Sequence, residues 1–261
     1  MIELRRPPGR FARVAHRGAS ALAPENTLRA FELAVELGCD MVEFDVLPLR
    51  DGTLVLAHSK DLREVSHGAA RGRVRGRTLE ALRRVAPELP TLDEALAYFA
   101  ERLPGVGLQV DLKLPGVEAA VVEALRRHGV LERSWVSGSD APSLRRVAAI
   151  EPALPRSYTL PRDRFGISRR GPLAPVVRTA LASIGASLPR RLPELVARAD
   201  ASATTLHFSV ASVAAVRRAH EVDAAAYVWT VDDPRLAQRL VDAEVDGIIT
   251  NDPRIFGSLK T

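Results

Sequence analysis

The chain has 261 residues, of which 46% are hydrophobic and 26% are charged, and a formal net charge of +5. This composition is typical of a globular protein of one or two domains, and no apolar run reaches the length of about 18 residues that a membrane helix needs. The single cysteine, Cys39, excludes an intrachain disulfide, and residues 1–10 lack the apolar core of a secretion signal. We therefore expect a cytoplasmic protein without stable membrane insertion.

The basic residues are almost all arginine. Only three of the 37 basic residues are lysines, and the arginines are scattered along the chain, while aromatic residues make up 5%. Proteins that bind nucleic acid gather their basic residues into patches or stripes, so we expect no nucleic-acid partner. The positive net charge still favours small anionic molecules.

Eight short apolar segments alternate with amphipathic stretches along the chain. The apolar segments are 12–15, 41–46, 107–112, 134–137, 155–159, 204–208, 225–230 and 247–250. Helical spacing recurs over 27–37, 117–128, 143–150, 210–220 and 234–243. Eight strands alternating with helices predict an α/β fold, a (β/α)8 TIM barrel. No linker or internal repeat divides the chain, so we assign residues 1–261 to one domain.

The alternation breaks after the second of these strands. Residues 54–57 return across a turn at Asp51-Gly52 and so bring His58 beside Asp45. Residues 59–88 form a short insertion, which is polar and basic up to residue 77 and helical over 78–85. Four alternating arginines predict either a solvated loop or a lid that attracts phosphate; they are Arg71, Arg73, Arg75 and Arg77.

Two carboxylates share one face of the second strand. Glu43 and Asp45 lie two residues apart, about 7 Å along a strand, while the opposite face is apolar and should be covered by helices. Two acids this close raise each other's pKa unless a cation lies between them. The pattern predicts either a metal site or a strand end with solvated acids.

The third barrel strand repeats the pattern. Gln109, Asp111 and Lys113 share one face, which adds a third carboxylate and a cation. A ligand set of oxygen atoms without cysteine suits Mg²⁺ or Ca²⁺ better than Zn²⁺.

These residues belong to an ordered set of motifs. The set resembles the glycerophosphodiester phosphodiesterase family along nearly the whole chain. The motifs are H-R-G at 16–18, P-E-N-T at 24–27, A-F-x-x-A-x-x-x-G-x-D-x-V-E-x-D-V at 30–46, D-G-x-x-V-x-x-H at 51–58, L-P-T-L-D-E at 89–94, W-T-V at 229–231 and G-I-I-T at 247–250.

The resemblance implies a metal-dependent phosphodiester hydrolase that cleaves glycerophosphodiesters to sn-glycerol 3-phosphate and an alcohol. Its divalent cation would be Mg²⁺ or Ca²⁺. The implied catalytic pair is His16 and His58, and the implied metal ligands are Glu43, Asp45 and Asp111. Most of these side chains, with Trp229, fall at the C-terminal ends of predicted strands, where barrel enzymes build their sites.

Chemistry supports these roles. Histidine titrates near neutrality, so His16 and His58 can divide the acid and base duties in either order. Arg17 can bind a phosphate through two donors and Lys113 can add a point charge.

Trp229 would stack on the substrate or simply fill the barrel. Glu25 and Asn26 are expected to fix the first loop rather than to act chemically. His207 ends a strand and is a weaker candidate for substrate contact.

The chain departs from the family pattern at four places. Asp111 stands where the family usually has Glu, and its shorter side chain puts metal affinity in question. Ser59 and Asn251 each stand where Asp is usual, and Ser137-Gly138-Ser139 replaces S-S-F. We expect these three changes to affect only loop packing and the pocket wall.

Two alternatives to the leading hypothesis remain. The first is the same chemistry on lysophospholipids, which would require an apolar channel beside the site. The second is a barrel that binds phosphodiesters without turning them over.

Overall fold

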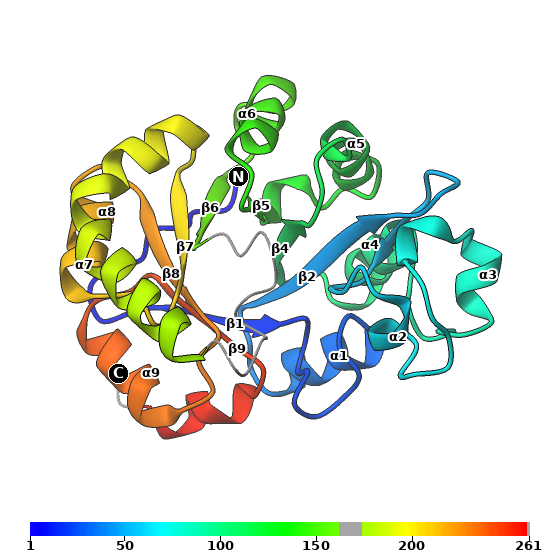
Figure 1. Cartoon of the computed structure of the whole chain (residues 1–261), viewed down its shortest axis with the longest axis horizontal. Coiled ribbons are helices and arrows are strands. Elements are labelled where there is room, and N and C mark those ends of the chain that lie inside the picture. Colours follow the sequence, from blue (N-terminus) through cyan, green and yellow to red (C-terminus); the bar gives the residue numbers. More distant parts are fainter. Residues whose placement is uncertain (162–173, 260–261) are drawn as a thin grey trace.

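The structure, a computed structural model, describes residues 1–161 and 174–259. Within these residues, eight parallel strands close into a barrel, because β1 pairs with both β2 and β9 (Figure 1). The TIM-barrel prediction is therefore confirmed. The barrel strands are β1 (Ala12–His16), β2 (Met41–Pro48), β4 (Gly107–Leu112), β5 (Ser134–Gly138), β6 (Arg156–Leu160), β7 (Ala203–His207), β8 (Ala225–Trp229) and β9 (Gly247–Thr250).

Helices surround the barrel (Figure 1). They are α1 (Leu28–Glu36), α4 (Leu92–Arg102), α5 (Glu118–Arg127), α6 (Ala141–Ile150), α7 (Ala174–Ala199), α8 (Val213–His220) and α9 (Pro234–Asp242). Two of these, α4 and α7, lie outside the five amphipathic stretches predicted above. Helix α7 contains Pro189 and Pro193, residues that argue against a helix interior. Helix α4 begins with a capping box, in which Thr91 and Glu94 satisfy each other's backbone N–H groups.

The two faces of the strands pack differently. On the outer face of β2, Phe44 lies 5.7 Å from Phe99 of α4 and 6.0 Å from Phe31 of α1, measured between ring centroids. Inside the barrel, Trp135 and Tyr227 pack in contact at 4.8 Å and fill its N-terminal part with other apolar side chains. The apolar filling confines the polar side chains to the C-terminal end of the barrel.

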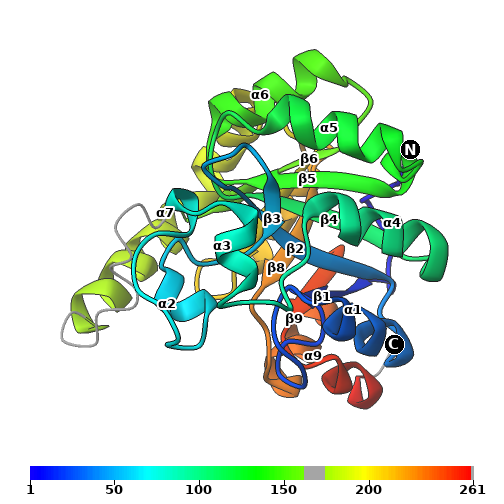
Figure 2. The same cartoon turned by 90° about the vertical axis from the view of Figure 1, so that its right-hand side faces the viewer.

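The insertion has its own small core. It follows β3 (Leu54–Leu56), which pairs antiparallel with β2, and it contains α2 (Leu62–Val65), a 3-10 turn at Val74–Gly76 and α3 (Leu79–Arg83). Figure 2 shows α2 and α3 beside β3. The core of this part consists of Leu49, Val55, Leu62, Val74, Leu82 and Ala86.

No helix among the described residues combines the length and the apolar character that a membrane crossing requires.

Candidate active site

A small pocket of about 60 Å³ opens at the C-terminal ends of the barrel strands. It contains every residue that the sequence assigns to the site except Asp45, which is fully buried beneath it. The lining residues are His16, Arg17, Glu43, His58, Gln109, Asp111, Lys113, Thr159, Thr205, Trp229 and Ile249. The fold therefore brings together the predicted residues, although they come from distant parts of the chain.

The first loop is shaped by Gly18. Its φ of +78° favours glycine, and a Cβ added there would lie 2.6 Å from the carbonyl carbon of Ala30 in α1. The close approach allows the N–H of Ala19 to donate to the carbonyl oxygen of Ala30 at 2.9 Å. The glycine of H-R-G thus holds Arg17 against the barrel mouth.

Asn26 ties the same loop to β2. Its Nδ2 donates to Asp45 Oδ2 at 3.0 Å, and the N–H of Asp45 donates back to Asn26 Oδ1 at 3.0 Å. The neighbouring Thr27 caps α1 by accepting from the N–H of Ala30. The expected loop-fixing role of Asn26 is therefore seen in the structure, and Thr27 is the residue that caps the helix.

Asp45 is held between two cations. Lys113 Nζ lies 2.6 Å from Asp45 Oδ1 and 2.6 Å from Asp111 Oδ2, and Arg17 Nε lies 3.0 Å from Asp45 Oδ2. Burial alone would raise the pKa of Asp45, but Lys113 and Arg17 outweigh it and hold this pKa far below its usual value. Burial likewise would lower the pKa of Lys113, yet Asp111 and Asp45 raise it above its usual range.

The surroundings of Glu43 shift its pKa in the opposite direction to that of Asp45. Burial and the nearby charge of Asp45 raise its pKa well above the ordinary value. The N–H of Arg17 donates to Glu43 Oε2 at 2.9 Å, and the Arg17 guanidinium is directed to Asp45 and to Glu25, whose Oε2 lies 2.5 Å from Nη1. Glu43 is thus a buried carboxylate in a place that favours additional positive charge.

The carboxylates fit a divalent cation. Glu43, Asp45 and Asp111 each present a ligand atom, and these atoms all lie within 4.8 Å of one another. With Glu25, four carboxylates face the two cations Arg17 and Lys113, which leaves two negative charges when all are ionised. A hard divalent ion suits both this charge and the oxygen ligands.

Asp111 is engaged on both oxygens. Its Oδ1 accepts from Ser137 Oγ at 2.7 Å, and its Oδ2 forms the ion pair with Lys113. Because each carboxylate oxygen has two lone pairs, both remain able to bind a cation.

His16 is buried at the end of β1. Its Nδ1 lies 2.7 Å from Asn251 Oδ1, and its ring centroid lies 6.3 Å from that of Trp229. Burial, assisted by the charge of Arg17, lowers the pKa of His16 to about 3, so the ring is neutral near pH 7. Asn251, which was expected to affect only loop packing and the pocket wall, contacts His16 of that wall directly through its side chain.

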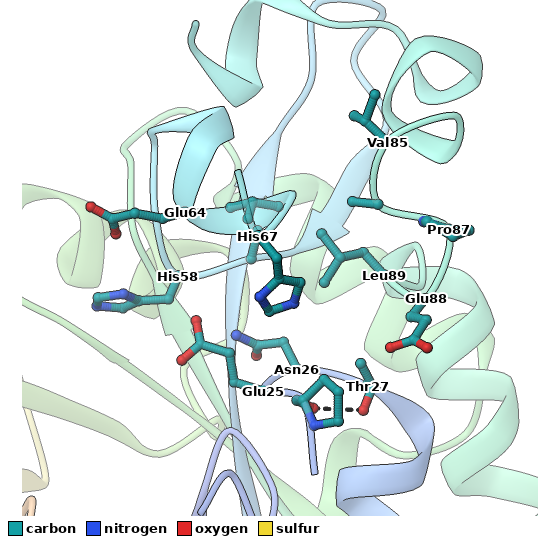
Figure 3. Close-up of a pocket in the computed structure, with 14 residues that line it drawn as sticks. Glu25, Asn26, Thr27, His58, Glu64, His67, Val85, Pro87, Glu88 and Leu89 are labelled. Atoms are coloured by element: carbon teal, nitrogen blue, oxygen red, sulfur yellow. Dashed lines mark hydrogen bonds between the residues drawn. The ribbon is translucent and has the colours of Figure 1, made fainter. Parts of the chain in front are cut away.

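His58 lines the same pocket from the end of the β2–β3 hairpin. The hairpin brings it there, since the N–H of Ala57 donates to the carbonyl oxygen of Asp45 at 3.0 Å. His58 also lines a second cavity of about 370 Å³, formed by residues 24–27 and the insertion. Figure 3 shows His58 at one end of this cavity, with His67 and Leu89 over its middle.

The alternating arginines of the insertion line neither cavity. Arg71 and Arg73 border a separate shallow depression with Lys60 and Arg63.

Apart from Arg17 Nε, which forms an ion pair with Asp45, three side-chain atoms of the pocket wall are buried without a hydrogen-bond partner among the residues that the structure describes: Gln109 Oε1, Thr159 Oγ1 and Trp229 Nε1. Gln109 and Thr159 are not among the residues that the sequence predicts for the site. The strand alternation placed Gln109 on the face of Asp111, which is the signal that could have identified it. Thr159 is the last residue of the predicted strand 155–159, and its position at the C-terminal end of a strand is the signal that could have identified it. His207, the weaker candidate, packs edge-on against Trp229 at 5.3 Å and lies outside the pocket lining.

Comparison with known proteins agrees with this geometry. A family model described as the glycerophosphoryl diester phosphodiesterase family matches residues 16–255. The chain belongs to this family. The sequence-based resemblance is confirmed, and membership places the protein among the phosphodiester hydrolases.

One curated relative and two solved structures of similar length resemble this chain, and the structures share its fold. A glycerophosphodiester phosphodiesterase of Caldanaerobacter subterraneus subsp. tengcongensis is 29% identical over 94% of this chain and 96% of its own. The crystal structure of a glycerophosphodiester phosphodiesterase from Thermotoga maritima has a TM-score of 0.74 at 22% identity, covering 96% of this chain and 99% of that one. A phosphodiesterase from Oleispira antarctica, solved with the product sn-glycerol 3-phosphate, has a TM-score of 0.73 at 24% identity, with 95% of each chain covered.

The lowered pKa of His16 predicts a specific dependence of stability on pH. Between pH 6.5 and about 3 the unfolded chain binds a proton at His16 that the folded chain does not. The free energy of unfolding should therefore fall as the pH decreases through this window, by up to about 1.4 kcal/mol per pH unit from this residue. Urea unfolding of His16→Gln should show a shallower decrease than the parent, whereas exposed His67→Gln should not. Equal slopes for all three proteins would contradict the burial of a neutral His16.

Proposed function

We propose that this enzyme hydrolyses glycerophosphodiesters to sn-glycerol 3-phosphate and an alcohol, with a divalent cation, Mg²⁺ or Ca²⁺. The observation that carries the proposal is the meeting of two histidines, two cations and three carboxylates around one pocket. The product bound to the Oleispira antarctica relative supports the choice of substrate.

Arg17 and Lys113 are the proposed phosphate-binding groups. Both line the pocket, and both are anchored from behind by Asp45, which keeps their charges at the pocket floor. A preorganised cation stabilises the negative charge that develops on the phosphoryl oxygens in the transition state. The ion pairs with Asp45 therefore serve binding by fixing where the positive charge stands.

The two histidines are the proposed proton carriers. A water oxygen forms the new bond to phosphorus while one imidazole accepts the water proton. The bond from phosphorus to the alcohol oxygen breaks, and the other imidazole donates a proton to the leaving oxygen. The products are sn-glycerol 3-phosphate and the free alcohol, and the two histidines then exchange protons with solvent.

Glu43, Asp45 and Asp111 would hold the cation. When bound, it polarises the phosphoryl group and gives the Glu43 carboxylate a positively charged partner. These three residues come from neighbouring strands, because Asp45 and Asp111 are paired in the β2–β4 register. The rigid sheet thus fixes the spacing of the ligands.

The unpartnered polar atoms of the wall support recognition of glycerol. Gln109 Oε1 accepts, Trp229 Nε1 donates and Thr159 Oγ1 can do either. A buried polar atom without a partner costs about 1–3 kcal/mol, so a ligand that satisfies it gains affinity. The two hydroxyls of a glycerol moiety have the required donors and acceptors. We therefore propose that Trp229 belongs to the substrate-binding wall rather than to the barrel filling.

The assay that tests the proposal follows glycerol 3-phosphate release from glycerophosphoethanolamine and glycerophosphocholine. We expect release with Mg²⁺ or Ca²⁺ and none with EDTA. His16→Ala and His58→Ala should each lower kcat by about 100-fold or more, while each variant remains folded. Turnover that EDTA leaves unchanged would refute the metal requirement, and near-normal kcat in either variant would refute the acid–base pair. No release with any metal would favour the barrel that only binds phosphodiesters.

The variant Asp111→Glu tests whether the shorter side chain at position 111, where the family usually has Glu, affects metal binding. The longer side chain restores the usual reach to the cation, so metal affinity should hold or increase. Isothermal titration with Mg²⁺ and Ca²⁺ in the absence of substrate measures this directly. Glu123→Asp on helix α5 provides a control outside the site. A large loss of affinity in Asp111→Glu would show that Asp111 is not a ligand.

The cavity beside His58 supports a second candidate, hydrolysis of lysophospholipids. Much of its wall is apolar, with Ala57, Val65, Val85, Ala86 and Leu89 among the lining residues. Such a wall can accept either the alcohol of a small diester or part of an acyl chain. Choline release from lysophosphatidylcholine, measured beside release from glycerophosphocholine, separates the two. A higher kcat/KM on the lysophospholipid would make it the preferred substrate.

A further inference from the structure

A line of hydrogen bonds runs from His16 to a carboxylate outside the pocket lining. His16 Nδ1 lies 2.7 Å from Asn251 Oδ1, and Asn251 Nδ2 donates to Asp232 Oδ2 at 2.7 Å. The backbone N–H of Asn251 also donates to Asp232 Oδ1, at 2.8 Å. Asp232 and Asn251 follow β8 and β9, so the line crosses three neighbouring strands at the barrel mouth.

The carboxylate of Asp232 determines which atom donates and which accepts in each hydrogen bond of this line. The carboxylate oxygens of Asp232 act as acceptors, since Oδ1 accepts from the backbone N–H of Asn251 and from Thr250 Oγ1 at 2.9 Å. The amide nitrogen of Asn251 must therefore face Asp232, which leaves Oδ1 toward His16. Because Oδ1 can only accept, Nδ1 of His16 must carry the hydrogen. Nε2 of the neutral ring is then the nitrogen with a free lone pair.

Ser20 contacts both His16 and Asn251. Its Oγ lies 2.8 Å from the carbonyl oxygen of His16 and 3.0 Å from Asn251 Oδ1, and it can donate to either. Every contact of the Asn251 oxygen is thus with a possible donor. An inverted amide would place its N–H₂ group against His16 Nδ1 and its oxygen against Asp232, where two acceptors would meet.

Resting on the function proposed above, we propose that Asn251, oriented by Asp232, is a positioning residue that fixes His16 in the Nδ1–H tautomer and leaves Nε2 as the atom that takes the proton from the attacking water. His16 is then the general base, and His58 donates the proton to the leaving alcohol. Neither Asn251 nor Asp232 lines the pocket, so both act through His16.

The pair also explains how an amide replaces the carboxylate that the resemblance leads one to expect at position 251. A carboxylate there would face Asp232 at hydrogen-bond distance, and two acceptors would repel. Asn251 and Asp232 therefore form a donor–acceptor pair, and exchanging the two side chains should preserve it. In Asp232→Asn/Asn251→Asp, the new amide can donate to the new carboxylate, which still accepts from His16 Nδ1.

The tautomer can be observed directly. In ¹⁵N-histidine-labelled protein at pH 7.5, a protonated ring nitrogen and an unprotonated one resonate far apart, and loss of the signal in His16→Gln assigns His16. We expect Nδ1–H in the parent and in the exchanged double variant, and a mixture of tautomers in Asn251→Leu. An Nε2–H tautomer in the parent would overturn the proposal. This spectrum requires no turnover, so it stands apart from any failure of the proposed activity.

Kinetics provide the second readout. Asn251→Leu should lower kcat by at least about tenfold with little change in KM, because the base is misoriented while the phosphate-binding groups stay in place. The exchanged double variant should recover kcat to within about threefold of the parent. Asp252→Asn alters the next residue, which pairs with Arg254, and serves as the control with unchanged kcat.

Should Asn251→Leu fail to fold, the exposed Asp232→Ala gives the same test, since it frees the amide to invert. Unaltered tautomer and kcat in a folded Asn251→Leu or Asp232→Ala would overturn the positioning role. Loss of kcat without recovery in the folded double variant would do so as well.

Discussion

The site depends on the burial of Asp45 between Lys113 and Arg17. A fully buried carboxylate is tolerated only when its charge is compensated, and here two cations and the side chain of Asn26 surround it. Removing one partner of such a buried pair typically costs about 3–5 kcal/mol. The same contacts fix the first loop, the end of β4 and the floor of the pocket. The burial of Asp45 therefore affects both the stability of the fold and the arrangement of the binding pocket.

Asp45 can be buried between these two cations because the inside of the barrel is apolar at its N-terminal end and polar at its C-terminal end. Trp135 and Tyr227 exclude water from the N-terminal part, and the polar side chains project from the other ends of the strands. In the low dielectric of this setting the lysine and arginine stabilise Asp45 strongly, while Glu43 is left short of positive charge. In the proposed function, a divalent cation would place a positive charge beside Glu43, and the phosphate of the substrate would bind Arg17 and Lys113.

The sequence predicted those features that follow from local periodicity. Alternation along residues 41–46 and 107–112 placed the acids on one face, and their register then follows from parallel pairing. Contacts between distant residues could not be predicted in this way. Asn251 reaches His16 across 235 positions of sequence, and its effect on the ring depends on which way its amide faces. Helix α7 is not predicted by local pattern because Pro189 and Pro193 are residues that disfavour a helix interior.

The most direct test of this account is hydrolysis of glycerophosphoethanolamine in H₂¹⁸O with the divalent cation present, followed by ³¹P NMR. We expect sn-glycerol 3-phosphate that carries one ¹⁸O on phosphorus, together with unlabelled ethanolamine, because water attacks phosphorus and the alcohol leaves. Release of free glycerol with phosphoethanolamine, or label in the alcohol, would contradict the proposed arrangement of the site.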